Sequence, residues 1–234
     1  MRVAVVSDIH GNLTAFEAVL ADLRASTPDM ILHGGDLAYG GSSPREVIDR
    51  IRDLGWPGVV GNADEMLYRP ASLADFGLPE PLSSALAEMA SWASSELGED
   101  RLNWLRELPL EQTRAPMALV HASPDDLWRA PQPEAADAVF DLYLSLNQPI
   151  VVYGHIHRPY VRQLRGMTVA NSGAAGIPYD GDTRASYLLI HDGRPTIRRV
   201  TYDVDREVAR IQTAKLPHAG WVIRVLASAR PQAL

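Results

Sequence analysis

The sequence predicts an α/β fold built from repeated units of strand, loop and helix. Each expected strand is a short apolar run rich in β-branched residues, and each expected helix carries apolar side chains at helical spacing. Strands are expected at 2–6, 30–32 and 57–60, and helices at 13–23, at about 44–53 and after the GNADE stretch. Units of this kind imply parallel strands joined by right-handed crossovers, with the loops gathered at the carboxyl ends of the strands.

The rest of the chain continues this pattern with one long helical stretch. Residues 79–107 are rich in Ala, Leu, Ser and Trp and predict a helical cap or flank, inserted within one domain that spans 1–234. The remaining strands are expected at 117–120, 149–153, 160–164, 168–170, 186–191 and 196–202, followed by helices near 204–215 and 220–229. The last four strands are short and closely spaced, which suits an antiparallel sheet.

Composition excludes several classes of protein. Apolar residues make up 46% and charged residues 22%, which is typical of a folded globular chain rather than a disordered one. There is no cysteine, so disulfides and thiolate metal sites are excluded, and any metal must be held by His, Asp, Glu or Asn. The first apolar run is too short for a signal peptide or a membrane span, and we expect a cytoplasmic protein with no membrane partner. A net charge of −7 argues against a nucleic-acid partner.

Residues that can bind metals follow the strands in five separate loops. They are Asp8 and His10, Asp36, Asn62, His121, and His155 with His157. Taken singly, such residues also form turns, helix caps or satisfied core histidines. Side chains at positions i and i+2 of an extended segment point the same way, so each pair can face a common centre. Five such loops at the edge where open α/β sheets bind ligands indicate a site for a first-row divalent metal.

The order of these motifs resembles that of the calcineurin-like metallophosphoesterases, whose pattern is D-x-H, G-D, G-N-H-[DE], H and G-H-x-H. The match covers positions 8 to 157. Similarity to a bacterial branch of small enzymes extends over SDIHGNLTAFEAVL, GDLAYGGSSPREVI, LVHASP, GHIHRP and NSGAAGIPYDGDTRASY. The resemblance implies a four-layer α/β/β/α sandwich with two metal ions at the strand ends.

The resemblance also implies a role for each ligand. Asp8, His10 and His157 would hold the first metal, Asn62, His121 and His155 the second, and Asp36 would bridge the two. We expect manganese first, with iron, zinc, cobalt or nickel as alternatives. Asp36 and Asn62 would then serve catalysis, because a hydroxide shared by two ions attacks phosphate esters at neutral pH.

The implied substrate is a small phosphate ester: a phosphomonoester, a phosphodiester or a nucleotide phosphoanhydride. The alternative is a non-catalytic or weakly active protein-interaction scaffold on the same fold. The sequence leaves open whether the protein forms a homo-oligomer.

One position departs from the family pattern. Ala63 stands where the family has the histidine of G-N-H-[DE], which donates a proton to the leaving oxygen or steadies the phosphate. Without that histidine to orient, Asp64 would serve only at the start of the helix. A positioned general acid is worth roughly 10²–10⁴-fold in rate. Three consequences stay open: the enzyme favours leaving groups that depart unprotonated, such as aryl phosphates or a phosphoanhydride; it uses another acid, His33 or a metal-bound water; or its activity is vestigial. His33 could equally be a strand-end histidine that packs near the site.

Residues for substrate binding are harder to identify. Arg158 and Arg184 could each donate to a phosphate oxygen, or they could be solvated. Asn12 could touch substrate or begin the first helix. The NSGAAG stretch at 171–176 could bring backbone N–H groups to an anion.

Overall fold

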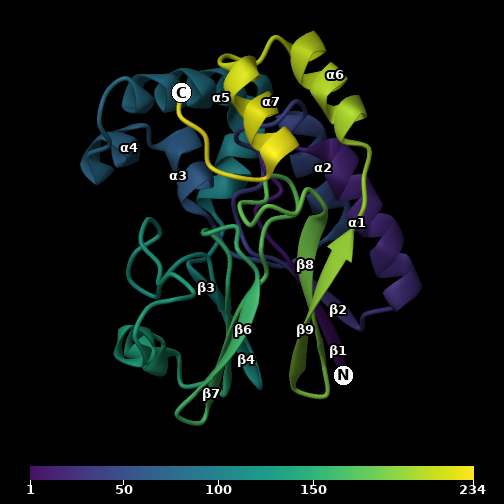
Figure 1. Ribbon diagram of the computed structural model, residues 1–234, viewed down its shortest axis with the longest axis vertical. Helices are drawn as coiled ribbons and strands as arrows, with labels where there is room; N and C mark the ends of the chain where they lie inside the picture. Colours follow the sequence, from purple (N-terminus) through teal and green to yellow (C-terminus); the bar gives the residue numbers. More distant parts are fainter.

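Two β-sheets packed face to face form the centre of the molecule in the computed structural model, which describes residues 1–234 (Figure 1). The four-stranded sheet has the order β2(Met30–His33), β1(Arg2–Val6), β8(Ala185–His191), β9(Arg194–Val200). The five-stranded sheet has the order β3(Glu111–Arg114), β4(Met117–Val120), β5(Ile150–Tyr153), β7(Met167–Asn171), β6(Tyr160–Leu164). Strands β1 and β2 pair in parallel, as do β4, β5 and β7, and the other pairs are antiparallel.

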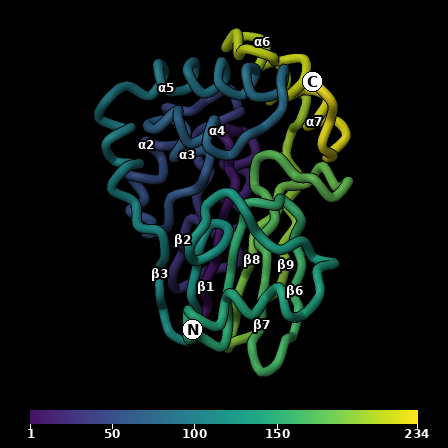
Figure 2. Tube along the Cα trace, turned by 90° about the vertical axis from the view of Figure 1, so that its left-hand side faces the viewer, coloured from purple at the N-terminus to yellow at the C-terminus, as the bar shows by residue number.

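Helices cover the outer faces of both sheets. They are α1(Leu13–Ser26), α2(Pro44–Leu54), α3(Asn62–Tyr68), α4(Ala71–Phe76), α5(Leu82–Arg106), the 3₁₀ helix η1(Asp137–Leu146), α6(Val204–Ala214) and α7(Ala219–Ser228). Figures 1 and 2 show α3 to α7 grouped at one end of the sheets, far from the N-terminus. None of these helices combines the length and the apolar character that a membrane span requires.

The core is divided into three layers by the two sheets. Between the sheets, Val5 of β1 packs in one cluster with Leu119 of β4. The outer face of the four-stranded sheet packs against the larger group of helices, where Phe16 of α1 and Tyr187 of β8 are fully buried. The outer face of the five-stranded sheet packs against η1, through residues such as Phe140. The predicted α/β/β/α sandwich is therefore confirmed, with a 3₁₀ helix as the regular element of the second outer layer.

The long helix α5 occupies most of the stretch expected to form a helical cap. It bends at Gly98, whose backbone leaves the helical region at φ 69° and ψ 167°. It packs along α2 and α3, and its first turns supply Leu82 and Leu86 to the cavity beside the site described below. The segment is thus part of the helical layer and also one wall of that cavity.

Two expectations about strands were wrong. The run at 57–60 makes only a single bridge, from Gly58 to His33, and not a full strand. The four strands after Pro159 do not form one antiparallel sheet: β6 and β7 extend the sheet of β4 and β5, whereas β8 and β9 join β1. Strand β7 is also parallel to β5. A local pattern of apolar residues identifies a strand, but it carries no information on which distant strand becomes its neighbour.

Candidate metal centre

The seven predicted ligands lie together at the end of the sheets that α3 to α7 cover. Asp8 and His10 follow β1, Asp36 follows β2, and Asn62 begins α3. The other three, His121, His155 and His157, follow β4 and β5 of the second sheet. Because the carboxyl ends of the parallel strands of both sheets meet here, residues separated by up to 149 positions in the chain become neighbours.

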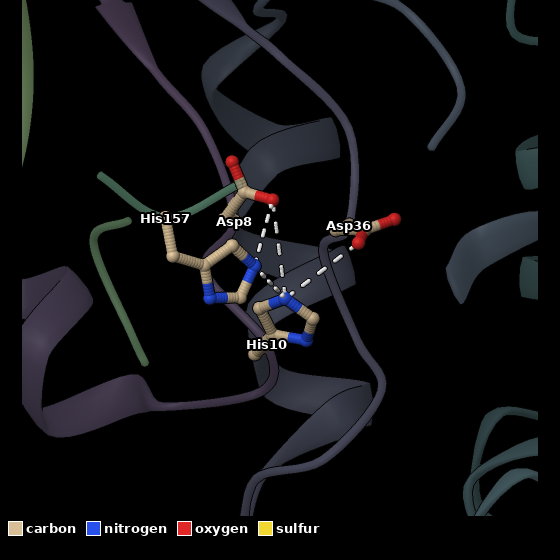
Figure 3. A group of neighbouring side chains, drawn as sticks. All are labelled: Asp8, His10, Asp36 and His157. Atoms are coloured by element: carbon tan, nitrogen blue, oxygen red, sulfur yellow. Dashed lines mark hydrogen bonds and ion pairs between the residues drawn. The ribbon is translucent and has the colours of Figure 1, made fainter. Parts of the chain in front are cut away.

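Four of these side chains form a compact cluster, which Figure 3 shows: Asp8, His10, Asp36 and His157. Each offers one ligand atom, and these atoms all lie within 4.8 Å of one another. The Nε2 atoms of His10 and His157 are 3.1 Å apart. His157 Nε2 is 3.2 Å from Asp8 Oδ1, and His10 Nε2 is 3.6 Å from Asp36 Oδ2.

The remaining three ligands form a second group on the other side of Asp36. Asn62 Oδ1 lies 2.9 Å from His121 Nε2 and 2.8 Å from His155 Nδ1. Asp36 Oδ1 is 3.5 Å from His121 Nε2, while its Oδ2 faces His10. The Asp36 carboxylate therefore lies between the two groups with one oxygen toward each, as a bridging ligand would.

The loops that carry these ligands have an unusual backbone. Asp8, His10, Asp36, His155 and His157 all have positive φ, between 51° and 64°. Non-glycine residues rarely adopt this left-handed region, and each such residue costs about 1–3 kcal/mol that the surrounding structure must offset. Asp8 and His10 belong to one group of side chains, as their spacing predicted, but His155 and His157 face different groups, and both pairs lie in tight turns and not in extended chain.

Hydrogen bonds between loops hold these turns in place. His10 N donates to Asp36 O at 2.9 Å, and Gly154 N donates to His121 O at 2.9 Å. Ala175 N and Gly176 N donate to the carbonyls of Ser7 and Asp8, each at 2.9 Å. The latter two N–H groups were expected to be available to an anion, and they are instead used to fix the first ligand loop.

The orientation of the histidine rings fits a bound cation. The Nδ1 atoms of His10, His121 and His157 each face a backbone carbonyl, of Tyr39, Gly34 and Ile177 respectively. A carbonyl only accepts, so each Nδ1 must carry the proton. When the rings of His10 and His157 are neutral, each Nε2 holds a lone pair, and the two lone pairs face each other, which is unfavourable unless a cation lies between them. The donor set of imidazole, carboxylate and amide oxygen suits first-row divalent ions.

Burial and the neighbouring side chains shift the pKa values of the groups in this site. Burial alone would raise the pKa of Asp8, but the neighbouring His157 brings it below its ordinary value. Burial lowers the pKa of His10, with His157 adding to the effect, and burial and His121 lower the pKa of His155 to about 4. Burial would also lower the pKa of His121, but Asp36 raises it to about 10. Without a metal, a proton on His121 compensates the charge of Asp36, and metal binding must displace it.

Asp64 has a larger role than the sequence predicted. Its carboxylate accepts from the backbone N–H of Gly61 at 3.1 Å, which is the helix-start role. It also accepts from Asp36 N and Leu37 N, both at 2.8 Å. Asp64 therefore positions the backbone that carries Asp36, although the histidine that it orients in the family pattern is absent. Asn62 is the first residue of α3 and not its cap, and its side chain is free to reach the histidines.

Two glycines are required for the close approach of these loops. A Cβ on Gly61 would lie 2.1 Å from Asp36 Oδ1 and 2.4 Å from Asp36 N. A Cβ on Gly154 would lie 2.3 Å from Asp8 Oδ2. Both positions therefore exclude any side chain, and the space that they leave is occupied by ligand carboxylates.

The residues expected to bind substrate lie outside the cluster. Arg158 is paired with Glu134, and Arg184 with Asp182 at 2.7 Å, and neither arginine lines the cavity at the site. Asn12 is fully buried and caps α1, since its Oδ1 accepts from Ala15 N at 2.9 Å. The helix-start interpretation of Asn12 is the one that the structure shows.

His33 is also outside the cluster of metal ligands. It is fully buried beside Trp104, with the two ring centroids 6.0 Å apart, and neither ring nitrogen has a hydrogen-bond partner. Burial lowers its pKa to about 3. His33 does not line the cavity, so the geometry matches the packing role and gives no support to a role as proton donor.

A cavity of about 330 Å³ opens directly beside the cluster. His10, Asp36, Asn62, His155 and His157 all line it. The other lining residues were not identified from the sequence; they include Tyr179, Trp128, Trp221 and the C-terminal residues Pro231 and Gln232. Tyr179 stacks on the ring of His157, with centroids 4.4 Å apart and planes 23° apart. Tyr179 lies within the NSGAAGIPYDGDTRASY stretch, but no local motif marks the other four, because they come from loops and helices far apart in the chain.

The fold and the site together define a metal-binding α/β protein with its ligands at the carboxyl ends of two facing sheets. Comparison with known proteins identifies the family: the model described as calcineurin-like phosphoesterase superfamily domain matches residues 1–193, and the chain belongs to that family.

Individual relatives cover nearly the whole chain. An uncharacterized protein of Methanocaldococcus jannaschii is 30% identical over 238 aligned positions, which include 92% of this chain and 93% of the relative. The crystal structure of a metallophosphoesterase from Sphaerobacter thermophilus is 29% identical, with a TM-score of 0.81, and covers 98% of this chain and 100% of its own. A hypothetical protein from Pyrococcus horikoshii shares the fold at a TM-score of 0.85 and 20% identity, with 99% of both chains covered.

Proposed function

We propose that this protein is a dinuclear metal-dependent phosphoesterase that hydrolyses phosphomonoesters, phosphodiesters or nucleotide phosphoanhydrides. One observation carries the proposal: potential ligand atoms from separate loops converge in two groups. His10 Nε2 and His157 Nε2 are 3.1 Å apart in one group, and Asn62 Oδ1 and His121 Nε2 are 2.9 Å apart in the other. The position of Asp36 between the groups supports a count of two ions rather than one.

The seven ligands divide between two ions in this proposal. Asp8, His10 and His157 hold one ion, while Asn62, His121 and His155 hold the other, with Asp36 shared. When bound, two such ions activate water and withdraw charge from the phosphoryl oxygens. Manganese is the metal that we expect first, on a donor set of imidazoles and hard oxygens.

The chain itself supplies position and charge balance. Asn62 contributes a neutral oxygen, so it adds a ligand without placing more negative charge against an anionic substrate. Asp64 and the carbonyl partners of the histidines keep the ligand atoms in place before any substrate arrives. Ala63 lines the cavity and offers no proton, so the leaving oxygen must depart as an anion or take its proton from water.

The test is hydrolysis that depends on both the metal and Asp36. Protein stripped with a chelator and then reloaded with Mn²⁺ is assayed on p-nitrophenyl phosphate and bis(p-nitrophenyl) phosphate. Activity should appear only after reloading, and Asp36→Asn should lower it by at least about 100-fold. Asp192→Asn, on an exposed turn, is the matched control and should retain full activity. A metal-replete protein that is inert on every ester would favour the scaffold alternative.

A further inference from the structure

The cavity beside the ligands has a polar floor and apolar walls. The metal ligands form its floor, and its walls are largely apolar, with Met66, Leu73, Leu82 and Leu86 among them. At about 330 Å³ it falls at the lower end of the roughly 300–1,000 Å³ range of small-molecule sites. A substrate whose phosphoryl group reaches the floor must therefore place the rest of its structure against these walls.

No lysine or arginine lines this cavity. All the positive charge available to a ligand would come from the metal ions on the floor. A polyphosphate chain or a second charged group would lose its hydration against apolar walls without gaining a partner, which is costly. An uncharged apolar group would instead gain about 25 cal/mol for each Å² of apolar surface buried.

Two tryptophans provide flat surfaces in the walls. Trp128 Nε1 donates to Glu65 Oε2 at 2.9 Å, and Trp221 Nε1 donates to the carbonyl of Gln232 at 2.9 Å. Trp128 is also stacked on Phe76, with centroids 5.1 Å apart and planes 30° apart. Because both indole N–H groups are already bonded, the two side chains are held in position and offer mainly ring carbon to the cavity.

We propose that the substrate is an aryl phosphate ester, and that Trp128 and Trp221 are specificity-determining residues that bind its ring. The inference rests on the proposed function, whose substrate class it narrows. In the reaction, the oxygen of water forms the new bond to phosphorus and releases one proton to solvent, the bond from phosphorus to the aryl oxygen breaks, and the released phenolate takes a proton from solvent. A phenolate can depart in this way without the proton donor that Ala63 cannot supply.

The experiment compares 2-naphthyl phosphate with glycerol 2-phosphate on the Mn²⁺-loaded protein. Trp128→Leu and Trp221→Leu should each lower kcat/KM for 2-naphthyl phosphate by about tenfold, through a raised KM, and change it less than about twofold for glycerol 2-phosphate. Trp92→Leu is the matched control: Trp92 is a half-buried tryptophan of α5 that packs on the core outside the cavity. It should leave both values unchanged. Equal losses on both esters, or no loss in either variant, would overturn the inference.

A binding measurement separates this inference from the proposed function. Calorimetric titration of the Mn²⁺-loaded protein with 1-naphthylmethylphosphonate and with methylphosphonate needs no turnover. The naphthyl compound should bind at least about tenfold more tightly, and this preference should disappear in the Trp128→Leu and Trp221→Leu variants. If neither ester is hydrolysed but this pattern holds, the proposed function fails and the aryl site stands. If the esters are hydrolysed and both phosphonates bind equally, the aryl site fails alone.

Discussion

His10 and His157 direct their Nε2 atoms at each other across 3.1 Å, although both atoms act as electron-pair donors. The carbonyls of Tyr39 and Ile177 enforce this arrangement, because each accepts a hydrogen bond from the Nδ1–H of one ring. Two lone pairs at this distance repel, and a cation between them turns the repulsion into two bonds. The approach of these two nitrogens, 147 residues apart in the chain, is what one would expect of two ligands of a single ion.

Removing one of these rings should therefore weaken metal binding. His157→Ala should raise the Mn²⁺ dissociation constant by at least about 100-fold, since even loss of a supporting hydrogen bond costs 10–100-fold. The constant is measured by competition with a fluorescent chelator. His191→Ala, at an exposed histidine of β8, is the control and should bind Mn²⁺ as the wild type does. Unchanged affinity in His157→Ala would remove this residue from the ligand set.

The Gly61→Ala variant tests the close contact of Gly61 with Asp36. The added Cβ would lie 2.1 Å from Asp36 Oδ1, so the bridging carboxylate must move. We expect Mn²⁺ affinity to fall by about 10–100-fold while the far-ultraviolet circular dichroism spectrum is retained. Gly220→Ala in the first turn of α7 is the control, because its nearest neighbour, Arg224 Nη1, is 3.8 Å away. Wild-type affinity in Gly61→Ala would contradict the bridging role of Asp36.

Restoring a proton donor at position 63 should widen the range of substrates. In the wild type, alkyl monoesters should turn over much more slowly than aryl esters at saturating substrate, because no acid protonates the alkoxide. Ala63→His should raise kcat for glycerol 2-phosphate by at least about tenfold, which is less than the roughly 10²–10⁴-fold that a well-positioned acid supplies. Ala63→Gln has a similar size and no such proton, so it should give no increase. Equal kcat values for both esters in a chemistry-limited wild type would refute this account of Ala63.

His33 should make the stability of the metal-free protein depend on pH. Its pKa is about 3 in the folded protein and 6.5 in the unfolded chain, so below pH 6.5 the unfolded chain binds a proton that the folded one does not. Stability therefore falls as pH decreases from 6.5 toward 3. Between pH 7.5 and pH 5 the contribution of His33 is a loss of about 2 kcal/mol in the free energy of unfolding.

Urea unfolding of the metal-free protein measures this contribution. His33→Leu keeps a buried apolar side chain beside Trp104 and has nothing to titrate. The difference in unfolding free energy between pH 7.5 and pH 5 should shrink by about 2 kcal/mol relative to the wild type. If the two proteins have the same pH dependence, the pKa of His33 is not lowered in the folded protein. That result would contradict the burial of its ring without hydrogen-bond partners.

The sequence was sufficient to predict the sandwich, and the structure brings the seven expected ligands together. The end of each strand can be recognised from nearby residues. Asp8, Asp36, His121 and His155 each follow a short apolar run, so the order of the chain places them at the carboxyl ends of parallel strands. The sequence could not assign β6 to β9 to their sheets, because strand pairing is decided by contacts between distant segments. A local pattern of apolar residues also does not distinguish the single bridge at Gly58 from a full strand.

The surroundings of the site were much harder to predict than its ligands. Asp64 looks like a helix-start residue in GNADE, and only the folded chain brings it to the N–H groups of Asp36 and Leu37. Arg158 and Arg184 looked suitable for phosphate by charge, yet each has a nearby carboxylate partner. Trp221 reaches the cavity because the chain turns back after α7, where Gln232 accepts its indole N–H. The contacts of Asp64, Arg158 and Trp221 are between separate parts of the chain and are not encoded by residue type, whereas Asp182 lies only two positions from Arg184.

The count of bound ions tests the central claim most directly. Metal-free protein is loaded with Mn²⁺ and desalted, its metal is quantified by mass spectrometry, and its electron paramagnetic resonance spectrum is recorded. Asp36 between the two ligand groups predicts two Mn²⁺ ions per chain with a spin-coupled spectrum, and Asp36→Ala should remove the coupling. Only traces of metal, or a single ion with the spectrum of isolated Mn²⁺, would contradict a dinuclear centre.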